Sequence, residues 1–158
     1  MPELFWDIES RSAASLRLGG LWNYAAHAST EVLCLCYAID DVEVQTWLPG
    51  QAAPEPFLAA ARDPGNWRLI AHNFEFERAI IEHQLVPKHG FPPIPLEAQH
   101  CSQAVALANA YPAELETLAR ALELPYRKDR EGIVLMRQMS RPRKPRKGED
   151  KNALHWVV

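Results

Sequence analysis

Two acidic side chains near the N-terminus have a spacing suited to metal-assisted chemistry. Asp7 and Glu9 lie two residues apart in "ELFWDIE", an otherwise apolar run that predicts a central β-strand. Side chains at i and i+2 of a strand share one face, about 7 Å apart along the backbone. Such a pair resists ionisation unless a cation joins it, so a divalent metal is one explanation. The alternative is that Glu9 merely ends the strand in solvent.

A third acidic side chain follows in residues 71–85, "AHNFEFERAIIEHQL". This stretch predicts an amphipathic helix that begins directly after Asn73, with Asn73 as its N-cap. At about 100° per residue, Glu77 falls in the middle of the apolar arc that should pack on the sheet. Glu75 and Glu82 fall on the opposite side and should face solvent.

The position of Glu77 predicts a shared acidic pocket. If its helix packs near the carboxyl end of the first strand, Glu77 meets Asp7 and Glu9 at the edge where open α/β sheets bind ligands. Mg²⁺ and Mn²⁺ take oxygen ligands, and two such ions about 4 Å apart can clamp a phosphodiester during its displacement. The position of Glu77 has another explanation, because a carboxylate at a helix start can reach solvent and benefit from the helix dipole. Gln84 lies in the same apolar arc, so polar residues can occupy it for other reasons.

The remaining elements predict a mixed α/β sheet flanked by helices. Strands are expected at 31–39, at 42–48 after a tight hairpin at Asp40–Asp41, and at 67–72, and the second should lie near an edge. A short helix should open at Pro54 and Pro56, and helical patterns follow at about 100–109, 114–122 and 129–139. Strands followed by helices favour this architecture over a helix bundle.

The bulk composition suits one globular domain over residues 1–158, with 47% hydrophobic and 23% charged residues. No apolar run approaches the about 18 residues of a membrane span, and the acidic N-terminus does not resemble a signal peptide, so we expect a cytoplasmic protein without membrane contact. Three cysteines are too few for a disulfide framework. Cys34 and Cys36 are either two thiols on one strand face or half a metal site with His100 and Cys101.

Basic residues concentrate at the C-terminal end. Residues 1–120 carry 7 basic and 15 acidic side chains, whereas residues 121–158 carry 10 basic and 5 acidic ones. The Pro-broken stretch 141–150 predicts a flexible basic loop. Its residues Arg141, Arg143 and Lys144 would contact nucleic-acid phosphates, or the stretch is a solvated linker.

Together these motifs resemble the 3′-to-5′ exonucleases that have four catalytic acids and a ribonuclease H-like fold, and in particular the proofreading exonuclease domains of bacterial and phage family A DNA polymerases. The similarity covers nearly the whole chain. It is carried by the stretches "WDIES", "AHNFEFE", "HCSQAVALANAYPAELETLARALEL" and "KDREGIVLMRQMSRP".

The resemblance implies a role for each acid. Asp7 would bridge two divalent cations, Mg²⁺ or Mn²⁺, and Glu9 would ligate one of them and help to position the attacking water. Glu77 takes the place of an acid, usually Asp, that holds the other cation, often through water. Because Glu is one methylene longer, its contact is either direct or shifted.

The resemblance also implies a substrate, a DNA 3′ end, and a polymerase domain in a longer parent protein. Asn73 and the backbone at Ser10 would hold the terminal nucleotide. His72 either lines the same site or packs at the strand end.

One motif of the family is not matched. A late helix should carry Tyr-x-x-x-Asp or His-x-x-x-x-Asp, which supplies the fourth acid. We expect this helix to follow residue 158, so that the chain is truncated before the third motif and lacks the last helix, with Asp129 as the alternative fourth acid. The predicted function is a metal-dependent 3′-to-5′ exonuclease. The alternatives are an inactive nucleic-acid-binding remnant and an oligoribonuclease-like enzyme that degrades RNA.

Overall fold

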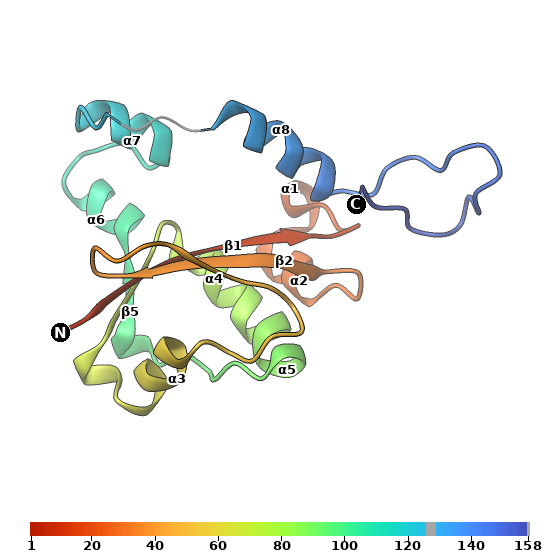
Figure 1. The fold of residues 1–158 in the computed structure, drawn as a ribbon. Coiled ribbons are helices and arrows are strands. Elements are labelled where there is room, and N and C mark those ends of the chain that lie inside the picture. The colour runs from red at the N-terminus through yellow and green to blue at the C-terminus, as the bar shows by residue number, and fades with distance from the viewer. Residues whose placement is uncertain (126–128, 158) are drawn as a thin grey trace.

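The computed structural model describes residues 1–125 and 129–157, which fold around a five-stranded mixed sheet (Figure 1). The strands are β1 (Glu3–Arg11), β2 (Glu31–Ile39), β3 (Gln45–Trp47), β4 (Arg68–Ala71) and β5 (Gln99–Cys101). Their spatial order is β3-β2-β1-β4-β5, with β2 antiparallel to β1 and β3, and with β4 parallel to β1 and β5. This sheet and its flanking helices confirm the predicted α/β fold of the ribonuclease H-like type, including the central first strand.

The helices surround this sheet (Figure 1). They are α1 (Leu16–Gly19), α2 (Leu21–Ala26), α3 (Glu55–Arg62), α4 (Phe74–Ile80), α5 (Val86–His89), α6 (Ser102–Ala108), α7 (Leu115–Ala121) and α8 (Arg130–Met139). Short 3₁₀ turns lie at Pro64–Asn66 and Leu96–Ala98, and a π-helical turn at Ile81–Leu85 joins α4 to α5. None of the described helices is long and apolar enough to cross a membrane.

The first strand alternates between a buried face and an open face. Trp6 is 5% exposed and makes edge-to-face contacts with Phe57 of α3 and Phe74 of α4, at ring-centroid distances of 5.4 and 5.5 Å. On the opposite face, Phe5 is 41% exposed and Asp7 is also exposed. The period of two along β1 therefore aims the apolar residues at α3 and α4 and places the Asp7 carboxylate outside the core.

Gln84 lies in the apolar arc of its helix because it has buried partners. Its side chain is 1% exposed, and its Nε2 donates a hydrogen bond to the carbonyl of Ala25 at 2.6 Å. Lys88 Nζ in turn donates to Gln84 Oε1 at 2.5 Å and to the carbonyl of Thr30 at 3.3 Å. This network connects the segment around α2 to the π-helical turn and α5, so Gln84 has a structural role.

Helices α6, α7 and α8 pass from β5 to the far end of β1 (Figure 1). After α8, the carbonyl of Ser140 accepts a hydrogen bond from the backbone N–H of Ser12 at 3.2 Å. The C-terminal part of the chain is therefore attached next to the end of β1.

Candidate metal and nucleic-acid site

A notch forms where β1 extends past β4. β1 has nine residues and β4 has four, and the two strands pair only between Glu3–Phe5 and Arg68–Ile70. On β4, the chain turns away soon after Ile70, the partner of Phe5, and passes through His72 and Asn73 into α4. Side chains of α4 and of the extended part of β1 consequently meet at the carboxyl ends of the parallel strands, where α/β sheets bind ligands.

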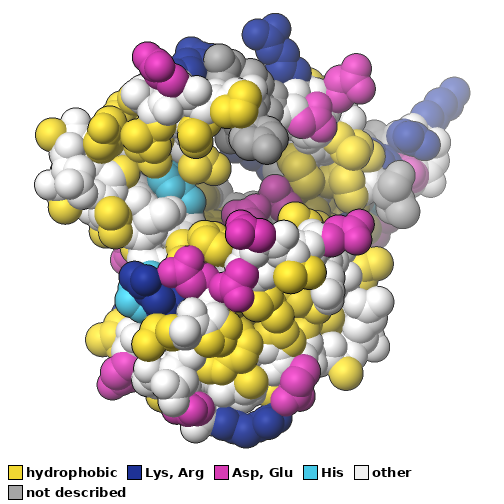
Figure 2. Space-filling model, turned by 60° about the vertical axis from the view of Figure 1, so that its left-hand side comes forward, with side chains coloured by type: hydrophobic (Ala, Val, Ile, Leu, Met, Phe, Trp, Pro, Cys, Tyr) yellow, Lys and Arg dark blue, Asp and Glu magenta, His cyan; other side chains and the backbone are white. Residues whose placement is uncertain are grey.

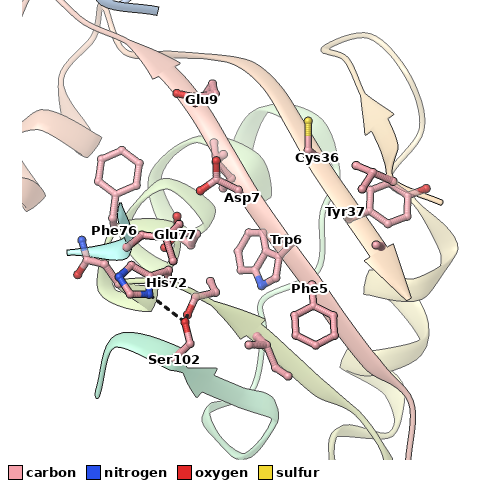
Figure 3. Close-up of a pocket in the computed structure, with 17 residues that line it drawn as sticks. Phe5, Trp6, Asp7, Glu9, Cys36, Tyr37, His72, Phe76, Glu77 and Ser102 are labelled. Carbon is pink, nitrogen blue, oxygen red and sulfur yellow. Dashed lines mark hydrogen bonds between the residues drawn. The ribbon is translucent and has the colours of Figure 1, made fainter. Parts of the chain in front are cut away.

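A cavity of about 700 Å³ occupies this notch (Figure 3). Asp7, Glu9 and Glu77 all line it, and Figure 3 shows Asp7 and Glu77 pointing toward one another. Residues from the ends of β4 and β5 and from β2 complete the wall, among them His72, Asn73, Ser102, Cys36 and Tyr37. The structure therefore brings the three predicted acids to one pocket.

Glu77 is the most unusual of these acids. Its side chain is 2% exposed, and its Oε2 atom is buried without a hydrogen-bond partner among the described residues. Burial raises the pKa of Glu77 to about 8, and the charges of Asp7 and Glu9 add to this rise. The predicted orientation is confirmed, because Glu77 is buried while Glu75 and Glu82 are exposed. A carboxylate in such a place is stabilised by a proton or by a cation.

The donor chemistry suits a hard divalent cation, because the cavity offers carboxylate oxygens and one of them lacks a partner in the described structure. Asp7, Glu9 and Glu77 are the residues that would hold Mg²⁺ or Mn²⁺. However, in the part of the chain that the structure describes, no three His, Cys, Asp or Glu side chains are grouped closely enough to hold a metal ion. The acids share a cavity without forming a closed set of ligands.

Cys34 and Cys36 share one strand face, and Cys36 also lines the acidic cavity. Cys36 and Cys34 lie directly opposite Asp7 and Glu9 in the β1–β2 ladder, so both thiols are on one strand face. Burial raises the pKa of Cys34 to about 11, and Cys36 and Glu9 contribute, which keeps its thiol protonated at neutral pH. Cys101 instead caps α6. The sequence interpretation of two thiols on one strand face is the correct one.

His72 is held by the chain on both sides of its ring. Nδ1 lies 3.1 Å from Ser102 Oγ, and Nε2 lies 2.7 Å from the carbonyl oxygen of Ala113. Because a carbonyl can only accept, Nε2 must carry a proton. His72 thus links the end of β4 to α6 and to the turn before α7. Its contact with a nucleotide stays a prediction.

Asn73 precedes α4 as expected, but it does not cap the helix with its side chain. Its backbone is left-handed, with φ of 66°, and it makes no side-chain cap hydrogen bond. Asparagine tolerates this conformation better than most residues, which suits the sharp turn from β4 into α4. The predicted N-cap position is therefore confirmed, although the side chain makes no capping hydrogen bond, and Asn73 is exposed and lines the acidic cavity.

A second cavity of about 460 Å³ lies on the other side of Glu9, and Ser10, Tyr24 and Arg141 also line it. Ser10 Oγ is 3.0 Å from Tyr24 Oη, and the Ser10 side chain is 6% exposed. Phe76, like Ile8 and Glu9, lines both cavities. Phe76 is not among the residues predicted from the sequence, although its position at the border of the apolar arc of α4 was the available signal.

The other predicted residues lie elsewhere. Asp129 is the N-cap of α8, where its Oδ1 accepts a hydrogen bond from the backbone N–H of Glu131 at 3.0 Å. Arg143 is paired with Glu149, and Lys144 is exposed in the loop after α8. These three predicted residues do not line the two cavities described above.

Fold and site together define an α/β domain with an acidic cavity at the carboxyl ends of its parallel strands. Figure 2 shows a hollow in this surface with acidic side chains inside it. The chain is 33% identical over 150 residues to a DNA polymerase of Bacillus phage SP02, an alignment that covers 93% of this chain and 22% of the polymerase. The chain thus spans only 22% of the length of that curated relative. No family model matches the chain. The similarity relates it to one segment of a DNA polymerase.

Proposed function

We propose that the chain is a metal-dependent 3′-to-5′ exonuclease domain of the proofreading type, which hydrolyses phosphodiester bonds at DNA 3′ ends within a polymerase. The observation that carries this proposal is the buried Glu77 carboxylate, whose Oε2 lacks a partner in the described structure and which shares a cavity with Asp7 and Glu9. Similarity to one segment of a phage DNA polymerase supports the polymerase context.

The chain's own residues would divide the work as follows. Asp7, Glu9 and Glu77 would hold two divalent cations, which supply charge stabilisation for the phosphodiester and activate a water molecule. Asn73 and the backbone at Ser10 would hold the terminal nucleotide. A cavity of about 700 Å³ is within the usual size range of small-molecule sites.

The test is stepwise shortening of 5′-labelled single-stranded DNA from its 3′ end, with Mg²⁺ or Mn²⁺ and with EDTA as the blank. Asp7→Asn and Glu77→Gln should each lower the rate by about 100-fold or more, as expected when a group that acts on the reacting atoms is lost. Glu75→Gln, on the solvent face of the same helix, is the matched control and should leave the rate unchanged. Wild-type activity in Asp7→Asn would refute the assignment. The same assay with RNA separates a DNA exonuclease from an oligoribonuclease-like enzyme.

A second candidate is nucleic-acid binding without hydrolysis. It is favoured by the absence, within the described residues, of three acids grouped closely enough for a metal, and by the position of Asp129 as a helix cap. Oligonucleotide binding by the purified chain, together with no nucleotide release at any Mn²⁺ concentration, would support this candidate over the enzyme.

A further inference from the structure

The chain after α8 forms a closed loop, residues 141–155. Arg143 and His155 pair across its base, and the Arg143 N–H donates to the His155 carbonyl at 2.7 Å. His155 Nε2 donates to the carbonyl of Asp150 at 2.8 Å. Figure 1 shows the loop projecting beyond α8. The sequence predicts a flexible stretch here, and the structure adds specific internal contacts.

An internal ion pair organises the loop. The guanidinium of Arg143 donates two hydrogen bonds of 2.7 Å to the two carboxylate oxygens of Glu149. Glu149 also accepts from the backbone N–H of Arg146 at 2.6 Å. These bonds, first that from Arg143, lower the pKa of Glu149 to about 2. Bidentate pairing fixes geometry as well as charge, so Arg143 and Glu149 act as a strut.

Contacts at both ends attach the loop to β1. The guanidinium of Arg11, the last residue of β1, lies 4.7 Å from the ring centroid of Trp156, directly after the loop. Arg11 is itself held by an ion pair with Glu31 of β2. Before the loop, Ser140 accepts a hydrogen bond from Ser12. The loop therefore has a defined place beside the sheet.

Basic side chains other than Arg143 give the loop an excess of positive charge on its exposed surface. Residues 141–152 include six Lys or Arg and two Asp or Glu, and the pair Arg143–Glu149 cancels one of each. Five further basic side chains are exposed and make no ion pair with residues that the structure describes: Arg141, Lys144, Arg146, Lys147 and Lys151. Pro145 lies between two of them and restricts the backbone.

We propose that the loop 141–155 is a preorganised binding site for the phosphodiester backbone of a single nucleic-acid strand. The contacting cations are Lys144, Arg146 and Lys147, and Glu149 is a positioning residue. Residues 1–120 carry 7 basic and 15 acidic side chains, so a polyanion approaching the acidic cavity needs a separate cationic contact. Arg141, at the start of the loop, lines the second cavity beside Glu9. That the bound nucleic-acid strand runs toward this cavity rests on the proposed function. Binding of its phosphodiester backbone to the loop does not rest on it.

The test is binding of a fluorescein-labelled single-stranded oligonucleotide, followed by anisotropy in EDTA over a series of salt concentrations. The triple variant Lys144→Gln, Arg146→Gln, Lys147→Gln should bind about tenfold or more weakly at low salt, and its slope of log affinity against log salt should be shallower by about 2, as expected for three lost phosphate contacts on a single strand. Wild-type affinity and slope in this variant would overturn the proposal.

A matched control removes the same charge elsewhere. Arg62, Arg68 and Arg120 are exposed on other elements, and their triple change to Gln should alter neither affinity nor slope beyond about twofold, since they lie outside the loop. Equal weakening by both triple variants would show that net charge alone causes the loss of affinity, and it would overturn the proposed binding site. Thermal unfolding confirms that both variants fold.

Glu149→Ala tests the positioning role. This change makes the loop more positive, so net charge alone predicts tighter binding, whereas loss of the strut predicts weaker binding with a shallower salt slope. Tighter binding would overturn the role of Glu149. Binding to anionic phospholipid vesicles, with no effect of the triple variant on the oligonucleotide, would assign the loop to membranes instead.

Failure of the loop and failure of the enzyme are distinguishable. The binding assay contains EDTA and needs no hydrolysis, whereas the exonuclease assay depends on Asp7. If the loop variant loses binding while Asp7→Asn keeps full nuclease activity, the loop proposal stands and the proposed function does not.

Discussion

Replacing Glu77 by Gln should stabilise the metal-free protein at alkaline pH. The Glu77 pKa is raised from 4.5 to about 8 in the native chain, first by burial and then by the charges of Asp7 and Glu9. The unfolded chain loses this proton near the ordinary value. Between these two pH values unfolding therefore releases a proton, and the free energy of unfolding falls as pH rises and levels off above about 8.

The magnitude follows from the size of the pKa change. Each pKa unit corresponds to about 1.36 kcal/mol, so the ionised Glu77 costs the native state on the order of 5 kcal/mol above pH 8. This is a large part of the about 5 to 15 kcal/mol that stabilises a typical domain. Gln resembles the protonated acid in shape and charge, so Glu77→Gln should match the wild type near pH 4 and exceed it at pH 9.

Urea unfolding in EDTA, followed by the fluorescence of the five Trp residues, measures this difference from pH 4 to pH 9. Glu75→Gln, on the exposed side of the same helix, is the matched control and should follow the wild-type curve. Mn²⁺ at pH 8 should raise the stability of the wild type more than that of Glu77→Gln. Parallel pH curves for wild type and Glu77→Gln would refute the account of Glu77 as a buried, strained carboxylate.

Three further predictions concern the core and the thiols. Gln84→Leu should destabilise the chain by about 1 to 3 kcal/mol in urea unfolding, because the buried carbonyl of Ala25 loses its donor; an unchanged midpoint would contradict that role. Phe57→Ala should cost about 3 to 5 kcal/mol, since Phe57 is fully buried between aromatic rings, and a loss below about 1 kcal/mol would contradict this. Cys34, with its pKa raised to about 11, should resist iodoacetamide at pH 8 until the chain is unfolded in urea, as peptide mass spectrometry would show.

The sequence predicted those features that follow from local periodicity. Alternation along "ELFWDIE" placed Asp7 and Glu9 on one face of β1, and the helical arc placed Glu77 toward the sheet, because side-chain direction is fixed by the period of each element. The pocket then required only that α4 begin at the end of β4.

Features that depend on specific pairing partners were not visible in the sequence. The strand β5 has three residues, and its parallel pairing with β4 across an intervening helix defines it, so a helix was expected to start near residue 100. Gln84 looked out of place because its partner Ala25 is 59 residues away. In the C-terminal stretch, the basic composition concealed that Arg143 pairs with Glu149 and is a strut within the loop.

The extension of β1 beyond β4 has a consequence for self-association. β1 continues past its last pair with β4, and natural sheets protect such strand ends with charged side chains against pairing with another chain. Asp7 and Glu9 lie on this extended segment, so the same carboxylates that would hold cations also discourage edge-to-edge pairing between copies. Inactive variants made by neutralising both acids should therefore be checked by light scattering, since a loss of activity in them can arise from aggregation.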